Sequence, residues 1–199
     1  SNYYSYPLSI TETTVLRARV IDSSCLFDQV KTSSYLINEE INLPVISLST
    51  DPGNFFDNDS GIYVFGDDAS GDYPYFGANF WEDWERPIHI EFFEPNGNLG
   101  FSQDAGSKIF GGWSRGQNQK SLSIFARSEY GNSEINYQIF PNKNIDSFKS
   151  IVLRNSGNDW YSGENWSSNS MFRDGMQTGL MDNTGIDHQA YRPSVVYLN

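Results

Sequence analysis

The sequence predicts an α+β fold in which a mostly antiparallel sheet is accompanied by few helices. Three observations carry this prediction: many short runs alternate apolar and polar residues, turn signals separate most of these runs, and a single run has helical spacing. Alternation with a period of two places one face of a strand in the core and the other in water. Many strands, then one helix, then one strand is the order of an α+β domain.

The clearest strand is predicted at residues 88–92, where apolar side chains alternate with His89 and Glu91. An Asn-Gly pair at 96–97 is typical of a hairpin turn, so Phe101 is expected to return beside this strand. Further strands are predicted at residues 16–20, 35–37, 43–48, 61–65, 121–126, 136–140, 150–154 and 191–198.

One helix is predicted over residues 171–180. Phe172, Met176 and Leu180 recur at the spacing of one helical face. The polar residues at 168–170 are of the types that cap helix N-termini, so the cap is expected there.

The chain is expected to hold one incomplete domain and the end of another. Residues 1–37 contain too few strands to close a sandwich and are interpreted as the tail of an upstream β-sandwich-like module. Residues 38–42 are polar and form the predicted junction, and residues 43–199 form the second unit. Because the chain begins at Ser1 without a methionine, we expect it to be a fragment of a longer protein.

Composition excludes several classes of function. The net charge of −12 opposes binding to nucleic acid or to an anionic membrane surface. No apolar run approaches the roughly 20 residues that span a bilayer. The single cysteine, Cys25, excludes an internal disulfide framework and a zinc site built from cysteines.

The most informative stretch for chemistry lies at residues 111–120, between two predicted strands. Gly111, Gly112 and Gly116 let the backbone approach a phosphate closely. Arg115 and Lys120 add two cations in an otherwise acidic chain, and both side chains suit phosphate oxygens. The alternative is a long hairpin whose charges are solvated, since a Gly-rich loop alone is a weak signal.

A second candidate stretch leaves the strand at 150–154 and enters a polar loop. Asp159 in that loop is placed to orient a water, a metal or a cation, whereas Asn155 and Asn158 fit Asx-type turns better. Arg173 lies in the first turn of the predicted helix, where the helix dipole disfavours a cation. It is therefore expected to have an acidic or phosphate partner, or to extend into solvent.

Three weaker signals concern metals and hydrolysis. Asp57 and Asp59 resemble a calcium loop, but the spacing departs from that of an EF-hand, so only a looser calcium site is considered. Acidic residues among tryptophans suggest sugar hydrolysis, at Glu82, Asp83 and Glu85. The two histidines, His89 and His188, have no matching nucleophile signature, so a serine or Cys25 triad is not predicted.

Five segments, taken as an ordered set, resemble the spore-coat CotH kinase-like family in the form found in large secreted proteins of Bacteroidota-type bacteria. They are LPVISLSTDP at 43–52, WERP at 84–87, GGWSR with KSL over 111–122, LRNSGNDW at 153–160 and MFRD at 171–174. The resemblance covers residues 43–199. Residues 7–37 resemble the end of a chitobiase/β-hexosaminidase C-terminal-type β-sandwich, which often precedes a CotH domain.

The resemblance implies the N-terminal part of an atypical protein-kinase-like fold, and phosphoryl transfer from ATP with Mg²⁺ to a protein. It carries over Arg115 and Lys120 as phosphate-facing residues and Arg173 as the arginine of the helix after the central strand. It also implies a secreted or cell-surface location. Family members continue past Asn199 with a lobe that holds the catalytic and metal-binding acids, so we name no catalytic base or metal ligand and expect the fragment to be inactive.

The alternative is a non-enzymatic secreted module that binds polysaccharide or a cell-surface partner. The five tryptophans motivate it, because aromatic faces stack on sugar rings; they are Trp81, Trp84, Trp113, Trp160 and Trp166. The competing interpretation is that most of these rings build the core. A third reading, a glycosidase accessory piece, rests only on the upstream sandwich-like segment.

Overall fold

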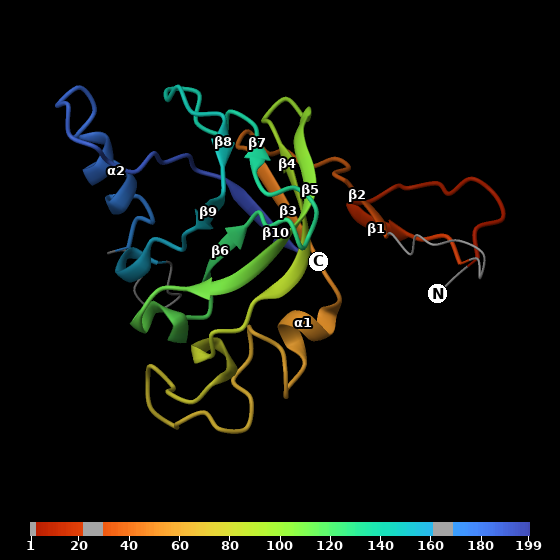
Figure 1. Ribbon diagram of the computed structural model, residues 1–199, viewed down its shortest axis with the longest axis horizontal. Helices are drawn as coiled ribbons and strands as arrows, with labels where there is room; N and C mark the ends of the chain where they lie inside the picture. The colour runs from red at the N-terminus through yellow and green to blue at the C-terminus, as the bar shows by residue number, and fades with distance from the viewer. Residues whose placement is uncertain (1–2, 22–29, 161–168) are drawn as a thin grey trace.

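The computed structural model describes residues 3–21, 30–160 and 169–199, and its centre is a six-stranded sheet in the order β10-β3-β4-β5-β6-β9 (Figure 1). All neighbouring strands are antiparallel except β10 and β3, which are parallel. The strands are β3 (Val45–Ser49), β4 (Arg86–Phe93), β5 (Leu99–Phe110), β6 (Ser121–Phe125), β9 (Ser150–Leu153) and β10 (Val195–Leu198).

Helices are few and short, as the sequence predicts. The described residues contain two α-helices, α1 (Pro52–Phe56) and α2 (Arg173–Gly179). They also contain three 3₁₀ turns, η1 (Asn79–Trp81), η2 (Trp113–Gly116) and η3 (Gly157–Asp159). The α+β class with a mostly antiparallel sheet is therefore confirmed. Within this described part, no helix has the length and apolar character needed to cross a membrane.

The hydrophobic core lies against one face of the sheet. The strand alternation directs Ile88, Ile90 and Phe92 of β4 to this face, and all three are buried. Phe101 of β5 stacks on Phe92 with ring centroids 5.6 Å apart, which is the cross-strand pairing predicted from the Asn-Gly turn. Phe55 of α1 completes this layer and is almost fully buried.

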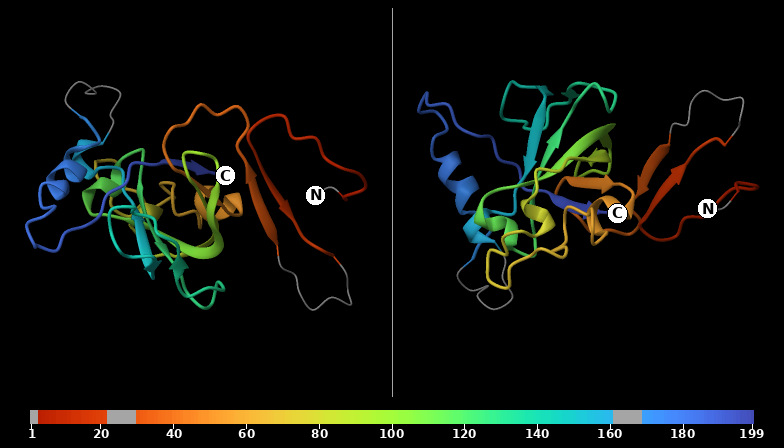
Figure 2. Two further views of the ribbon diagram at one scale, coloured as in Figure 1. Left: turned by 90° about the horizontal axis from the view of Figure 1, so that it is seen from above. Right: turned by 60° about the horizontal axis from the view of Figure 1, so that its bottom comes forward.

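Two strands near the N-terminus form a separate antiparallel hairpin, β1 (Thr14–Ala18) and β2 (Lys31–Tyr35) (Figure 2). It touches the main sheet through Ser34, whose backbone N–H donates to Glu91 Oε2 at 2.8 Å. The Ser34 hydroxyl also donates to the hydroxyl of Ser47 at 2.8 Å. The module boundaries at residues 37 and 43 stay predictions.

Three predicted strands share at most one residue with a strand of the structure. The one at 35–37 shares only Tyr35 with β2, which begins earlier, at Lys31. Residues 61–65 form turns and not a strand, because their N–H groups donate to α1 and the residues around it, as Tyr63 does to the Phe55 carbonyl at 2.9 Å. The run at 136–140 keeps only a short pairing, between β7 (Ile135–Asn136) and β8 (Ser147–Phe148). At 61–65 and 136–140, apolar side chains reach the core from irregular backbone. The resulting sequence pattern alternates apolar and polar residues as a strand does.

Candidate functional site

The glycines of the 111–120 stretch allow a tight turn between β5 and β6. Gly111 has φ +112°, and a Cβ there would lie 2.5 Å from the Ser114 hydroxyl oxygen. A Cβ on Gly116 would lie 2.9 Å from the ring of Tyr73. Both positions therefore need glycine, whereas Gly112 faces open space.

Arg115 folds back onto the turn that carries it. Its Nε donates to the Gly111 carbonyl at 2.7 Å, and its Nη1 donates to the carbonyls of Phe80 and Trp81 at 3.2 and 3.3 Å. The guanidinium also lies 5.7 Å from the centroid of the Trp81 ring. Arg115 thus ties η2 to η1.

Lys120 is buried at the end of the same turn, with 8% of its surface exposed. Its Nζ donates to the carbonyls of Arg115 and Gln117 at 2.8 and 2.9 Å. The ammonium lies 3.8 Å from the centroid of the Phe80 ring. Burial lowers the pKa of Lys120 to about 8, because the charged form loses its hydration.

The two predicted phosphate ligands therefore belong to one hydrogen-bonded unit, and neither extends into open water. The backbone of Arg115 accepts from Lys120, and both side chains reach toward η1 through Phe80. The hydrogen bonds of these two side chains that the structure shows all go to carbonyl oxygens. Their assignment to phosphate stays a prediction.

Asn155 connects this turn to the second candidate stretch, a role that the sequence did not indicate. Its Oδ1 accepts from the Gly157 N–H at 2.9 Å, which is the Asx-type turn expected there. The same oxygen accepts from the Ser121 hydroxyl at 2.8 Å, and Nδ2 donates to Gln117 Oε1 at 2.9 Å. Asn155 is 2% exposed, so it joins the two loops inside the protein.

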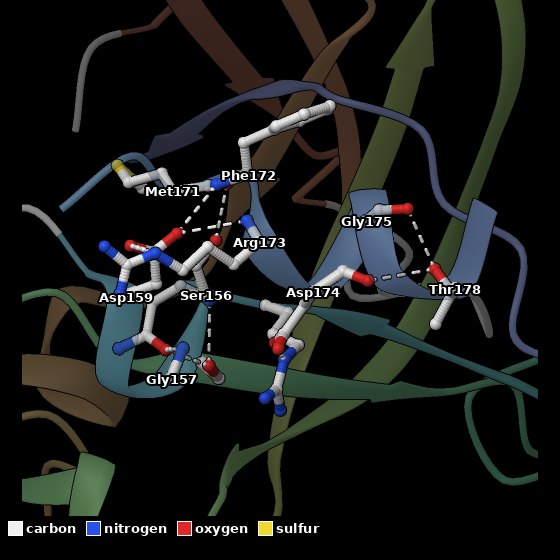
Figure 3. Close-up of polar contacts among 12 residues, drawn as sticks. Ser156, Gly157, Asp159, Met171, Phe172, Arg173, Asp174, Gly175 and Thr178 are labelled. Atoms are coloured by element: carbon white, nitrogen blue, oxygen red, sulfur yellow. Dashed lines mark hydrogen bonds and ion pairs between the residues drawn. The ribbon is translucent and has the colours of Figure 1, made fainter. Parts of the chain in front are cut away.

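Asp159 and Arg173, which the sequence singled out separately, lie together at the start of α2 (Figure 3). The Arg173 Nε is 3.4 Å from Asp159 Oδ1, so the expected acidic partner exists. The Asp159 carboxylate also accepts from the N–H groups of Ser170, Phe172 and Arg173 at 2.8, 3.0 and 3.1 Å. It caps the helix from a distant loop. The predicted N-caps Asn169 and Ser170 are wrong, since Phe172 occupies the N-cap position, and Ser168 lies outside the described residues.

Electrostatics at Asp159 follow from these contacts. Burial raises the pKa of its carboxyl group, but the hydrogen bonds from Ser170, Arg173 and Phe172 outweigh burial and hold the pKa below its ordinary value. Asp159 is therefore an ionised helix cap. It is placed to orient the cation of Arg173, which is one of the three roles that the sequence offered for Asp159.

Of the two acidic residues proposed for calcium, Asp57 has a local structural role. Asp57 Oδ1 accepts from the N–H groups of Asp59 and Ser60 at 3.0 Å and from the Ser60 hydroxyl at 2.9 Å. These bonds, the one from the Ser60 side chain first, lower the pKa of Asp57. Nearby lies a hollow of about 340 Å³, lined by Asn58, Asp59, Asp67, Asp68, Gly77, Asn79, Glu82 and Trp84. Among the residues that the structure describes, no group of three or more His, Cys, Asp or Glu side chains is placed to hold a metal.

The acids near Trp81 and Trp84 are engaged separately. Glu85 pairs with Arg127, whose Nε and Nη2 lie 2.9 and 3.0 Å from its oxygens. Asp83 pairs with Lys108. Each of these two acids thus has its own basic partner, an arrangement typical of ion pairs and not of a cooperating acid and base.

Both histidines lie in polar clusters. His89 is hydrogen-bonded to Asp104 through Nδ1 at 2.6 Å and to the Ser102 hydroxyl through Nε2 at 2.9 Å, which is the bonding order of a Ser-His-Asp triad. A nucleophile also needs a substrate hollow, and none of the three lines the hollow beside Asp59 or the one beside His188. His188 Nε2 lies 2.8 Å from Lys143 Nζ. Cys25 and Trp166 fall outside the described residues.

The fold and the turn define an α+β domain whose central sheet carries two cations on one Gly-rich connection. Residues 108–199 match the family model described as CotH kinase protein, a stretch that begins within β5 and includes the turn, Asp159 and α2. The resemblance to the CotH family is confirmed over these residues. The chain matches no curated protein. It also matches no solved structure. The upstream chitobiase-type module stays a prediction.

Proposed function

We propose that the turn between β5 and β6 binds the phosphates of ATP and that the protein takes part in phosphoryl transfer to a protein substrate. The observation that carries this proposal is the pairing of Arg115 and Lys120 on one turn, joined by the 2.8 Å hydrogen bond from Lys120 Nζ to the Arg115 carbonyl. The matching family, CotH kinase protein, includes this turn in residues 108–199. Phosphoryl transfer depends on positioned cations more than on covalent chemistry by the protein.

The charge of Lys120 supports an anionic ligand. A buried ammonium whose hydrogen bonds go to carbonyls lacks the full charge partner that burial normally requires. A phosphate would supply that partner. An ammonium has three N–H donors, and the carbonyls of Arg115 and Gln117 use two of them, so one donor remains for a phosphate oxygen.

Mg²⁺ with ATP is the cofactor that the family implies. The described residues offer no group of three or more acids or histidines for a metal, so we assign no metal ligand and no catalytic base within them. The same family likeness supports an atypical kinase-like architecture, of which this would be the N-terminal part, and a secreted or cell-surface location. We propose that residues 1–199 by themselves are inactive in phosphoryl transfer.

The test is nucleotide affinity in the full-length protein. Lys120→Ala is expected to abolish ATP binding, and Arg115→Ala to weaken it at least tenfold, both measured by calorimetry. Lys108→Ala is the matched control, because Lys108 is a lysine of β5 that pairs with Asp83 and not with the turn. Unchanged affinity in the Lys120 variant, checked for folding by its thermal transition, would reject the site.

A second candidate function is a module that binds surface polysaccharide without catalysis. One observation favours it: of the four tryptophans that the structure describes, Trp113 is 62% exposed and lies among other exposed aromatic rings. Glycan binding that does not respond to ATP would support this function over the first.

A further inference from the structure

Four exposed aromatic side chains gather around the candidate turn. They are Phe65, Tyr73, Phe76 and Trp113, here called the aromatic surface, and they are 49, 47, 53 and 62% exposed. Three belong to the loop that precedes η1 and the fourth to η2. The loop and η2 lie close together at the lower end of the molecule in Figure 1, and η1 contacts η2.

The rings of the aromatic surface form one connected set. The Trp113 ring lies 6.1 Å from Tyr73 and 6.4 Å from Phe76, in edge-to-face geometry. Tyr75 links Tyr73 to Phe65, with ring centroids 5.9 and 5.0 Å apart. An apolar surface that connects side chains from two separate segments marks a binding site more strongly than scattered single residues do.

This surface is held in place. The Tyr73 hydroxyl donates to the Trp113 carbonyl at 2.7 Å, and Trp81 Nε1 donates to the Pro74 carbonyl at 2.9 Å. Arg115 adds its bonds from η2 to the carbonyls of Phe80 and Trp81. A ligand would therefore meet a preformed surface and would not have to order these backbone segments on binding.

The chemistry of the surface selects the kind of ligand. Its exposed apolar side chains are all aromatic, whereas the core of a protein–protein interface normally includes aliphatic side chains and methionine. A pyranose ring presents an apolar face of C–H groups, which packs on an aromatic ring, and an edge of hydroxyls. Exposed carboxylates of the same loop, Asp67, Asp68 and Asp72, are acceptors for such hydroxyls.

The negative charge of the protein further restricts the class of ligand. These aspartates and the net charge of −12 repel sulfated or carboxylated polysaccharides. We propose that the aromatic surface binds a neutral polysaccharide chain, with Trp113 and Phe76 as the principal stacking residues. The proposal rests on the second candidate function and does not require Arg115 or Lys120 to bind phosphate.

An array of neutral, amino-bearing and anionic oligosaccharides, probed with the whole chain, tests this inference. We expect neutral oligosaccharides to bind and anionic ones not to bind. For the neutral oligosaccharide that binds best, Trp113→Ala and Phe76→Ala are each expected to weaken affinity at least tenfold in calorimetry. Phe172→Ala is the matched control, since Phe172 is 51% exposed but lies at the start of α2, outside the aromatic surface.

The possible results separately test polysaccharide binding, the aromatic surface as its site, and the preference for neutral chains. If no oligosaccharide binds, both the inference and the polysaccharide function are rejected. Binding that is unchanged in the Trp113 and Phe76 variants rejects the aromatic surface alone. A preference for anionic chains rejects the charge argument. Binding should persist in Lys120→Ala and in the presence of ATP.

Discussion

Lys120 carries a positive charge into a site made of carbonyls and aromatic rings. A lysine whose pKa is lower in the folded chain than in the unfolded chain makes folding less favourable while it is protonated in both states. The unfolded chain holds the extra proton between pH 8 and 10.5. Folding stability from this group therefore rises as pH increases through that range.

The expected outcome is a pH-dependent stability that Lys120 causes. Between pH 7.5 and 9.5 the group should add about 2 kcal/mol to the free energy of unfolding. Lys120→Met should remove this rise, and urea unfolding at the two pH values measures it. Equal pH dependence in the two proteins would show that the amine is not desolvated. Added ATP should diminish the rise in the parent protein, because phosphate favours the charged amine.

For individual residues, the sequence identifies the candidates for the site but does not predict their hydrogen-bond partners. The Gly-Gly-Trp-Ser-Arg pattern identified Arg115 and Lys120 as belonging together, and the structure joins them. The carbonyl partners of Arg115 at Phe80 and Trp81 lie more than thirty residues away, and no local pattern encodes that contact. The Asx turn at Asn155 was predictable from its residue type, whereas its bonds to Ser121 and Gln117 depend on the sheet.

Asn155 should be essential for the contact between the β5–β6 turn and the loop after β9. Asn155→Ala leaves the Ser121 hydroxyl and the Gly157 N–H without their acceptor in a buried place. We expect a loss of about 3 kcal/mol in the free energy of unfolding. Asn158→Ala is the control, since Asn158 is exposed, and it should change little. A small effect of the Asn155 variant in chemical denaturation would contradict the link.

Among the elements, α2 depends on a cap that comes from elsewhere in the chain. Seven residues form only a short helix, and such a helix is marginal without tertiary support. Asp159→Ala removes the acceptor for three N–H groups, so the amides of Ser170, Phe172 and Arg173 should lose protection in hydrogen exchange. Asp174→Asn, which removes the partner of Arg154 on the same helix, should leave those amides protected.

Sequence periodicity predicted the strands that have one buried face and failed where loops enter the core. Residues 88–92 and 121–126 alternate because the sheet has its core on one side. Residues 61–65 alternate for another reason: Ile62 is buried, but the backbone there hydrogen-bonds to the α1 region. The helix lies where its apolar spacing predicted it, but Phe172, Met176 and Leu180 are 51, 47 and 70% exposed and form no buried face. Its cap was not predicted, because Asp159 is distant in sequence.

At the scale of the molecule, one edge strand of the central sheet comes from a distant part of the chain. The final strand β10 lies parallel to β3, with Val195 opposite Val45. The sequences of the two strands do not predict that they pair, since parallel pairing depends on the path of the whole chain. For the separate β1–β2 hairpin, the sequence likewise predicts short strands but not their pairing. The order of the strands was therefore not predictable, although most of the strands were.

Arg192 anchors the segment that leads into β10. Its guanidinium forms a two-pronged ion pair with Glu94 at the end of β4, and its Nη1 donates to the Ile139 carbonyl at 2.7 Å. The Tyr137 hydroxyl donates to the same carboxylate at 2.6 Å. Three segments thus meet at one ion pair whose side chains are 15 and 22% exposed.

Removing this ion pair should destabilise the whole sheet and not only its edge. Arg192→Ala leaves Glu94 without its charge partner, and we expect a loss of about 2 kcal/mol in the free energy of unfolding. The hydrogen bond from Arg192 lowers the pKa of Glu94, so this contribution exists at neutral pH and disappears as pH falls through the lowered pKa. The variant and the parent should therefore converge in stability at acid pH. Denaturation curves for Arg192→Ala, Glu94→Gln and the double variant measure the coupling, and additive losses at neutral pH would contradict it, because residues that form one contact unit should lose less together than the sum of the separate losses.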